Sequence, residues 1–213
     1  MIKAVLFDFD GVIVSSEEIH RLTFIELLSK DVSQSRWYSE FAGTGSRKIF
    51  KKLLDEDGKT ADTNELVEKR RIMFNKHVDA GEAKEISGLS DFLYFLREKN
   101  IKIAIVSGGH RGYIEKLIDM LGIVDYFDYI VTADDIPYRK PDPKPFLMAA
   151  EFLGIPPEDC LVIEDSYSGC QAARSAGMKL IWMRPYPEMN APVADQIIDD
   201  FTDKQIFNWF NSK

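Results

Sequence analysis

The stretch AVLFDFDGVIVSSEEIH, residues 4–20, begins with four apolar residues and then places Asp8 and Asp10 two positions apart. Its apolar start predicts a strand over Ala4–Phe9 that is buried on both faces. Carboxylates at the end of such a strand are costly to bury unless they are paired, hydrogen-bonded or bound to a metal. Because side chains alternate along an extended chain, Asp8 and Asp10 are expected to point to the same side. The rest of the sequence should therefore supply partners for both carboxylates.

Four further apolar runs predict strands that would join this one in a sheet. They are Ile101–Val106, Tyr129–Thr132, Cys160–Ile163 and Leu180–Met183. Continuous apolar runs of this kind favour strands that are covered on both faces, as in a parallel sheet. Helical patterns lie between the runs, and three of them are followed by a glycine, a residue that commonly ends helices. The alternation predicts an α/β fold with a doubly wound, Rossmann-like, mostly parallel sheet.

One interval in this alternation is too long for a single crossover. Asp8 and Ser107 are 99 positions apart, whereas a strand–helix–strand unit takes about 30 or more residues. The interval contains helical patterns only, over residues 17–30, 46–54 and 64–77, and Ser46 is the expected N-cap of the second. The sequence therefore predicts a core domain formed by residues 1–15 and 83–213, with an inserted α-helical domain over residues 16–82.

Composition and charge narrow the class of protein. The chain has 213 residues, of which 45% are hydrophobic and 29% charged, as in ordinary globular proteins. Its net charge of −8 argues against nucleic acid or a membrane surface as a partner, since those partners usually need a basic face. The sequence has no apolar run of membrane-spanning length and no signal-like start, so we expect a cytoplasmic protein, by default a monomer. Cys160 and Cys170 lack zinc-site spacing and are expected to be reduced, in or near the core.

Acidic residues stand at the end of two predicted strands. Asp8 and Asp10 end the first, and Glu164 and Asp165 end the fourth. The carboxyl ends of the strands in an open α/β sheet form the ligand-binding edge. Two carboxylates in one pocket divide naturally into a metal-bound nucleophile and a group that donates and accepts a proton. Glu164 and Asp165 add hard oxygen ligands of the kind that suit Mg²⁺.

Groups that favour an anion follow the second and third predicted strands. Ser107 and the backbone N–H of Gly108 form a predicted anion cradle at a helix start. Lys140, in the segment RKPDP, offers a point charge for the same anion. Together with the carboxylates, these residues predict phosphoryl transfer, with a carboxylate nucleophile, a metal ion, a cationic clamp and an acid for the leaving oxygen.

The ordered set of motifs resembles the haloacid dehalogenase superfamily, in its phosphatase and β-phosphoglucomutase-like branch with a helical cap domain. DFDGVIVSSE resembles the first motif of that family, VSGG the second, KPDP the lysine motif and IEDSYSG the acidic fourth motif. The motifs span residues 8–169 in the family's order, and the predicted helical insertion falls where the family has its cap. The resemblance therefore covers essentially the whole chain.

The resemblance implies a role for each acidic residue. Asp8 would attack phosphorus and become an aspartyl-phosphate, and Asp10 would protonate the leaving oxygen and then activate water. The implied cofactor is Mg²⁺, bound by Asp8, by the backbone carbonyl of Asp10 and by Asp165. Glu164 would be either a further ligand or, as we slightly favour, an outer-shell partner.

The resemblance also implies how the substrate is held. Ser107 and Lys140 would hold the transferring phosphoryl group of a small phosphorylated metabolite, with Gly108 as a further contact. In the predicted cap, Arg47 follows a glycine-rich loop and resembles a substrate-reading residue, and His20 resembles a histidine near the hinge. The alternative is an exposed Arg47 and a His20 packed beside Phe24. The run Lys69–Arg71 is expected to be a solvated helix face.

Several functions remain to be compared. Hydrolysis of a small phosphomonoester is the first hypothesis, and a sugar phosphomutase that uses the same aspartyl-phosphate chemistry is the alternative. Asp10 disfavours a dehalogenase, which in the family lacks this acid, and a phosphonate-cleaving member, which typically replaces it. A receiver-type signalling module is disfavoured too, because its acceptor aspartate lies on the third strand and it has no large insertion after the first.

Overall fold

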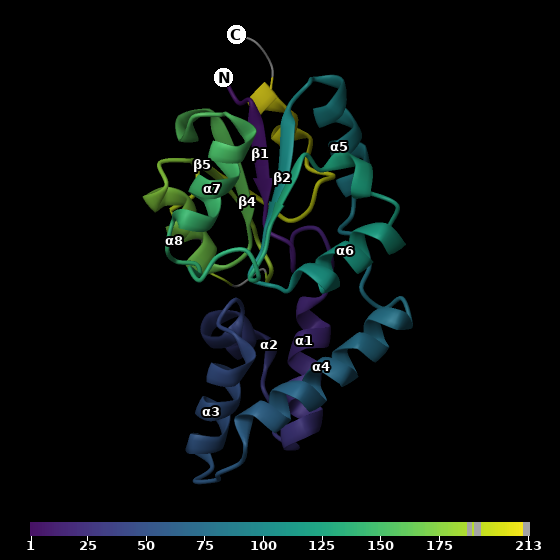
Figure 1. Cartoon of the computed structure of the whole chain (residues 1–213), viewed down its shortest axis with the longest axis vertical. Helices are drawn as coiled ribbons and strands as arrows, with labels where there is room; N and C mark the ends of the chain where they lie inside the picture. Colours follow the sequence, from purple (N-terminus) through teal and green to yellow (C-terminus); the bar gives the residue numbers. More distant parts are fainter. Residues whose placement is uncertain (187–188, 190–192, 211–213) are drawn as a thin grey trace. The chain divides into compact units, whose positions relative to one another are not determined.

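The computed structural model describes residues 1–186, 189 and 193–210 and contains a six-stranded sheet (Figure 1). Every strand pair in it is parallel, and the strand order is β3-β2-β1-β4-β5-β6. The strands are β1 (Ala4–Phe7), β2 (Lys102–Val106), β3 (Tyr129–Val131), β4 (Cys160–Glu164), β5 (Lys179–Met183) and β6 (Gln196–Ile198). The predicted α/β fold with a parallel sheet is confirmed, and five of the six strands lie within two residues of their predicted ends.

Helices cover both faces of this sheet, α7 and α8 on one side and α5 and α6 on the other (Figure 1). These helices are α5 (Leu89–Glu98), α6 (Arg111–Met120), α7 (Lys144–Leu153) and α8 (Tyr167–Ser175). Ala4 and Leu6 belong to the cluster that packs against α7 and α8. Phe7 points the other way and packs against Phe92 of α5 at 6.1 Å between ring centroids. A strand buried on both faces therefore needs the uninterrupted apolar run that the sequence shows.

The contacts divide the chain into two compact units, Met1–Val14 with Glu85–Lys213, and Ser15–Lys84. The second unit is helical, and its apolar cluster is centred on Phe24, Trp37 and Phe50. Its elements are α1 (Glu17–Leu28), α2 (Gln34–Arg36), the π-helix η1 (Trp37–Phe41), α3 (Ser46–Glu56) and α4 (Thr63–Asp79). The sheet unit also contains the 3₁₀ helices Val124–Tyr126, Pro157–Asp159 and Lys204–Phe210.

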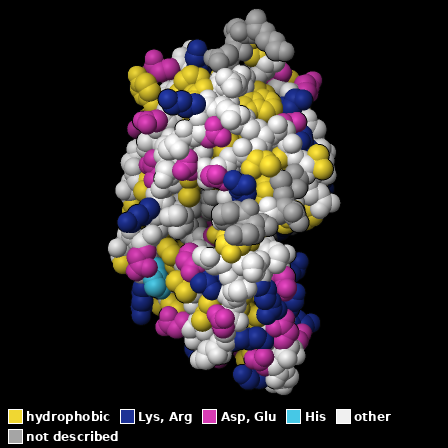
Figure 2. Space-filling model, turned by 180° about the vertical axis from the view of Figure 1, so that it is seen from behind, with side chains coloured by type: hydrophobic (Ala, Val, Ile, Leu, Met, Phe, Trp, Pro, Cys, Tyr) yellow, Lys and Arg dark blue, Asp and Glu magenta, His cyan; other side chains and the backbone are white. Residues whose placement is uncertain are grey.

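Charged side chains of both signs are interspersed on the face that Figure 2 shows. In the helical unit many of them are paired: Lys30 Nζ, for example, lies 3.0 Å from Glu56 Oε2 and 2.7 Å from Asp57 Oδ1. Exposed pairs of this kind contribute little to stability. Within the described part of the chain, no helix combines the length and the apolar character needed to cross a membrane.

Two local predictions differ from the structure. Ser46 is the first residue of α3 and not its N-cap, which is Gly45, and the Ser46 hydroxyl accepts a hydrogen bond from Arg70 instead. The short strand β6 was not expected, because a three-residue strand at the edge of the sheet, with Gln196 in first place, carries too few apolar residues to form a pattern.

Candidate active site

The ammonium group of Lys140 connects three strand ends at the carboxyl edge of the sheet. Its Nζ donates to Asp8 Oδ1 at 2.6 Å, to Glu164 Oε1 at 2.7 Å and to the backbone oxygen of Val106 at 2.8 Å. A lysine has three donors, so these bonds account for all of them. The side chains of Lys140, Asp8 and Glu164 are 11%, 14% and 0% exposed, so the charges are held largely out of water. Such a cluster is stable only because the charges are paired and hydrogen-bonded.

The backbone explains why Asp8 stands at this place. The N–H of Asp8 donates to the oxygen of Ile163 at 3.0 Å, which extends the pairing of β1 and β4 by one residue beyond β1. The chain then turns at Gly11, whose φ of 77° favours glycine, and the Gly11 N–H donates to Val14 O at 2.8 Å. Asp8 and Asp10 thus lie between a strand and a tight turn, where backbone bonds fix their positions.

Both carboxylate oxygens of Glu164 are in use. Oε1 accepts from Lys140, and Oε2 accepts from the backbone N–H of Ser166 at 2.7 Å and from its hydroxyl at 2.9 Å. Ser166 is also the N-cap of α8, since its hydroxyl oxygen accepts from the Gly169 N–H at 3.1 Å. The start of α8 therefore fixes Glu164, and Glu164 in turn helps to fix Lys140.

The electrostatics of the cluster follow from burial and pairing. Burial raises the pKa of Asp8 above its usual range, and the charge of Lys140 works against that rise. For Lys140 burial acts to lower the pKa, but the attraction of Asp8 and Glu164 outweighs it and raises the pKa above its usual value. Lys140 is therefore a fixed cation, and any further positive charge near Asp8 would favour its ionised form.

The acidic residues form a donor set that fits Mg²⁺. Asp8, Glu164 and Asp165 each offer a carboxylate oxygen, and these oxygens lie within 4.8 Å of one another. Hard oxygen ligands of this kind are typical of magnesium sites. The Asp165 backbone is fixed by the Trp182 Nε1–H, which donates to its carbonyl oxygen at 3.1 Å. Of the three carboxylates, Glu164 already accepts three hydrogen bonds, from Lys140 and Ser166.

Asp10 has a partner that the sequence analysis missed. The hydroxyl of Tyr113 donates to Asp10 Oδ1 at 2.6 Å, and the Tyr113 ring meets the ring of Phe9 edge-on at 5.5 Å. In the sequence, Tyr113 is simply one residue of a predicted helix. The signal that points to it is its position in the first turn of a helix that starts at the same sheet edge as the candidate site.

Ser107 and Gly108 follow the end of β2, next to β1. Ser107 is buried, its N–H donates to Val131 O at 2.9 Å, and its hydroxyl oxygen accepts from the Gly109 N–H at 3.0 Å. Gly108 is exposed, and among the described residues other than Gly108 and its two chain neighbours, nothing lies within 4 Å of the place where a β-carbon would stand. Helix α6 begins only at Arg111, so Ser107 and Gly108 lie in the loop before the helix and not in its first turn.

The candidate substrate residues of the helical unit contact neighbours within that unit. Arg47 is exposed, and its Nη2 donates to Asn64 Oδ1 at 2.8 Å. The ring of His20 stacks on Phe74, with 4.2 Å between centroids and 8° between planes, and its Nδ1 is hydrogen-bonded with Arg70. His20 is thus packed on an aromatic ring, that of Phe74.

The prediction of a solvated helix face over Lys69–Arg71 is wrong for Arg70. Its Nη1 donates to Ser46 Oγ at 2.9 Å, and its guanidinium lies over the ring of Phe24, 4.5 Å from the centroid. Arg71 does lie on the exposed face, where Nη2 pairs with Glu68 Oε1 at 2.6 Å. On α4, the side chain of Arg70 therefore points into the helical unit, and that of Arg71 points outward.

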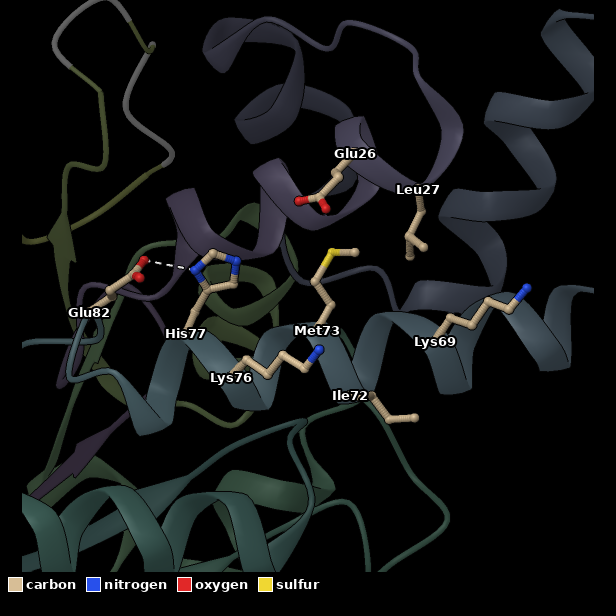
Figure 3. Close-up of a pocket in the computed structure, with 8 residues that line it drawn as sticks. All are labelled: Glu26, Leu27, Lys69, Ile72, Met73, Lys76, His77 and Glu82. Carbon is tan, nitrogen blue, oxygen red and sulfur yellow. Dashed lines mark hydrogen bonds and ion pairs between the residues drawn. The ribbon is translucent and has the colours of Figure 1, made fainter.

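An open groove of about 570 Å³ lies between α1 and α4 in the helical unit (Figure 3). Its lining combines apolar side chains with lysines and a His77–Glu82 hydrogen bond of 2.8 Å. The residues that line it are Glu26, Leu27, Lys69, Ile72, Met73, Lys76, His77 and Glu82. None of these lining residues is one of the candidate site residues.

The chain is similar to known proteins over most of its length. It is 33% identical over 184 residues to "Putative phosphatase YhcW" of Bacillus subtilis, which covers 85% of this chain and 83% of that protein. It is also 33% identical over 186 residues to the β-phosphoglucomutase of Bacillus subtilis, covering 83% and 80% of the two chains. The crystal structure of a β-phosphoglucomutase from Clostridium difficile has the same fold, with a TM-score of 0.83 at 24% identity over 99% of this chain and 98% of the other.

Residues 5–183 match the family model of the haloacid dehalogenase-like hydrolases. The matched span contains Asp8, Lys140 and Asp165, whose side chains the structure brings to one sheet edge. The resemblance predicted from the four sequence motifs is thereby confirmed, and the chain belongs to the haloacid dehalogenase-like hydrolase family.

Proposed function

We propose that the protein is a Mg²⁺-dependent phosphatase that hydrolyses a small phosphorylated metabolite, such as a sugar phosphate, through an aspartyl-phosphate on Asp8. The observation that carries the proposal is the Lys140 ammonium, which bridges Asp8 and Glu164 at the carboxyl edge of the sheet. A buried cation beside a carboxylate nucleophile is what transfer of a dianionic phosphoryl group requires. In this proposal residues 1–15 and 83–213 form the catalytic core, and residues 16–82 form the cap.

The first step transfers the phosphoryl group to the protein. An Asp8 carboxylate oxygen attacks phosphorus, the bond from phosphorus to the leaving oxygen breaks, and Asp10 gives that oxygen its proton. In the second step Asp10 takes a proton from water, the water oxygen attacks phosphorus, and the Asp8–phosphorus bond breaks to release phosphate. Asp10 thus acts as acid and then as base, and ends the cycle protonated as it began.

The remaining core residues hold charge in place. Lys140, the Ser107 hydroxyl and the Gly108 N–H would contact the oxygens of the transferring phosphoryl group. Asp8, Asp165 and the backbone carbonyl of Asp10 would hold Mg²⁺, with Glu164 in support. When bound, the ion would supply positive charge that offsets the negative charge of the phosphate and keeps Asp8 ionised.

Substitution of the nucleophile tests this proposal. Asp8→Asn keeps the size of the side chain but removes the attacking oxygen anion, so release of phosphate from p-nitrophenyl phosphate should fall at least about 1,000-fold. The matched control is Asp119→Asn on the exposed face of α6, which should keep full activity. Turnover by Asp8→Asn at the wild-type rate, with a melting curve like that of the wild type, would refute the assignment.

A sugar phosphomutase is the second candidate, supported by the 33% identity to a β-phosphoglucomutase. The two activities share the attack by Asp8 and differ in whether water or a sugar hydroxyl accepts the phosphoryl group. A difference of about 1.4 kcal/mol between those barriers changes the partition tenfold. The deciding experiment supplies β-glucose 1-phosphate with a trace of the 1,6-bisphosphate. Glucose 6-phosphate formed without an equal amount of free phosphate would establish the mutase.

Substrate contacts from the cap are part of the same proposal. Arg47 is exposed, and its guanidinium would bind a phosphate or donate to a sugar hydroxyl of the substrate. His20 stacks on Phe74 and is hydrogen-bonded with Arg70. Comparing Arg47→Gln with the exposed Arg71→Gln tests the first of these roles. Under the proposal, Arg47→Gln raises KM for the preferred sugar phosphate and Arg71→Gln leaves it unchanged.

A further inference from the structure

A short hydrogen bond joins Tyr113 to Asp10. The hydroxyl donates to Asp10 Oδ1 at 2.6 Å, a length typical of an O–H donor bound to a charged carboxylate. Tyr113 stands in the first turn of α6, whereas Asp10 belongs to the turn after β1. The bond therefore ties two separate segments of the sheet unit together at the residue that would move the proton.

The ring of Tyr113 is held on two sides. It meets Phe9, which is fully buried, edge-on at 5.5 Å and 86° between planes. On the loop side, the place of a β-carbon on Gly109 would be 3.3 Å from a carbon of the Tyr113 ring, so the loop backbone packs closely against it. The next residue, Ile114, is buried and anchors the first turn of α6. The hydroxyl consequently has a defined position from which to act on Asp10.

We infer that Tyr113 is a positioning residue for Asp10, an inference that rests on the proposed function. A carboxyl group with one oxygen fixed cannot rotate about its Cβ–Cγ bond without losing that hydrogen bond. The direction of Oδ2, which would carry the proton, is therefore set by the bond at Oδ1. Proton transfer depends strongly on such geometry, because the acid must reach the leaving oxygen within hydrogen-bond distance.

A tyrosine hydroxyl suits both forms of this carboxyl group. When Asp10 is ionised, Oδ1 accepts from Tyr113; when Asp10 carries its proton on Oδ2, Oδ1 is the carbonyl oxygen and still accepts. Tyrosine itself stays protonated near neutral pH. In the first step the Oδ2–H bond of Asp10 breaks as the leaving oxygen gains the proton, and in the second an O–H bond of water breaks and Oδ2–H forms again. Tyr113 keeps its proton throughout and takes no part as a reactant.

The leaving group provides a test that a merely structural role would not pass. Phenyl phosphate releases a more basic oxygen than p-nitrophenyl phosphate and needs the acid more. In Tyr113→Phe, which keeps the ring packing, kcat/KM should fall at least about tenfold for phenyl phosphate and much less for p-nitrophenyl phosphate, with KM unchanged for both. The control, Tyr94→Phe at an exposed site on α5, should change neither. Equal losses for the two esters, or no loss, would overturn the inference.

A double substitution separates this inference from the proposed function. If Tyr113 acts through Asp10, then Tyr113→Phe should not reduce the residual turnover of Asp10→Asn any further, whereas independent roles would reduce it again. Full activity of Asp10→Asn itself would refute the proposed mechanism. Loss of activity in Asp8→Asn and Asp10→Asn, with wild-type behaviour of Tyr113→Phe toward both esters, would refute the role of Tyr113 alone.

Discussion

The carboxylate of Glu164 fills the space in which a β-carbon on Gly169 would stand. Oε1 lies 1.6 Å and the carboxyl carbon 1.9 Å from that position, far inside any contact that real atoms make. Ser166 completes the cradle by donating to Oε2 from its N–H and hydroxyl. The first turn of α8 is thus shaped around Glu164, and through it around Lys140. A glycine is required at position 169 by space, since its φ is an ordinary helical one.

Gly169→Ala should therefore reduce activity although it leaves the proposed reacting residues, Asp8 and Asp10, unchanged. The added methyl group displaces Glu164, which then no longer fixes Lys140 beside Asp8. We expect kcat for p-nitrophenyl phosphate to fall about 100-fold, and the free energy of unfolding to fall by about 1–3 kcal/mol as after other overpacking substitutions. Steady-state kinetics and urea unfolding measure the two effects.

Gly112→Ala is the matched control for that substitution. Gly112 lies in α6, and outside the adjacent backbone of that helix no atom of the described residues lies within 4 Å of the place of its β-carbon, so the added methyl group causes no clash with them. It should leave kcat unchanged and stabilise the protein by up to about 1 kcal/mol, because alanine loses less conformational freedom in a helix than glycine does. If Gly169→Ala is as active as Gly112→Ala, the cradle has no role in catalysis.

Removal of divalent metal should silence the enzyme reversibly. Dialysis against EDTA is expected to abolish turnover, and Mg²⁺ should restore it, because carboxylate oxygens of Asp8 and Asp165 lie together at the candidate site. Asp165→Asn removes one charged ligand and should raise the Mg²⁺ concentration for half-activation at least about tenfold. Glu158→Gln, a change outside this cluster, should leave the titration as in the wild type. Undiminished turnover in EDTA would contradict the metal-dependent mechanism.

Asp128 should make part of the stability depend on pH. Its Oδ2 accepts from the Ile103 N–H at 2.8 Å and its Oδ1 from Lys102 Nζ at 3.0 Å, next to the β2–β3 edge. Burial opposes ionisation, but the bond from Ile103 and the charge of Lys102 outweigh it, so the pKa of Asp128 lies below its usual value. In the unfolded chain the pKa of an aspartate is about 3.9. The stabilisation is therefore present above that pH and is lost as the pH falls through the lower pKa of the folded protein.

Urea unfolding of Asp128→Asn at two pH values checks this sign. At pH 7 the variant should be less stable than the wild type by about 1 kcal/mol, and the gap should narrow on acidification toward pH 3. Asp119→Asn, at an exposed site, serves as control. Its free energy of unfolding should fall by the same amount as that of the wild type when the pH is lowered from 7 to 3. A gap that widens in acid would show that the sign is wrong.

The core of the fold was predictable because β1, β2 and β4 are almost entirely buried and are therefore built mainly from apolar residues. The meeting of Asp8 and Asp165 was predictable for a related reason, since polar residues directly after such strands converge at one edge. Lys140 lies in the loop between β3 and α7, and its segment RKPDP was the signal that pointed to it. Tyr113 was not, because its role depends on the distance between a helix start and a turn that are 103 residues apart in the chain. Sequence spacing carries no information on such a distance.

The prediction for Arg70 was wrong for a different reason. The helical spacing that places Arg70 on the apolar face of α4 was present in the sequence, but the neighbouring charges were given more weight. Leu66, Arg70 and Phe74 follow each other at steps of four and therefore share one face of α4. The neighbouring charges Lys69 and Arg71 made the segment read as a solvated face. Periodicity places a side chain on a face, but whether a cation there can be buried depends on partners such as Ser46 that lie elsewhere in the sequence.

The contrast between Arg70 and Arg71 gives the last prediction. Arg70→Leu removes the bonds to Ser46 and His20 and the cation over the Phe24 ring, and it should lower the free energy of unfolding by about 1–3 kcal/mol. Arg71→Leu, one residue along the same helix, removes only an exposed pair with Glu68, so it should change stability by less than about 0.5 kcal/mol. Urea unfolding of both variants at pH 7 compares them directly. Equal effects would mean that Arg70 contributes no more than a surface ion pair, and that the stability of the helical unit does not depend on this partly buried guanidinium.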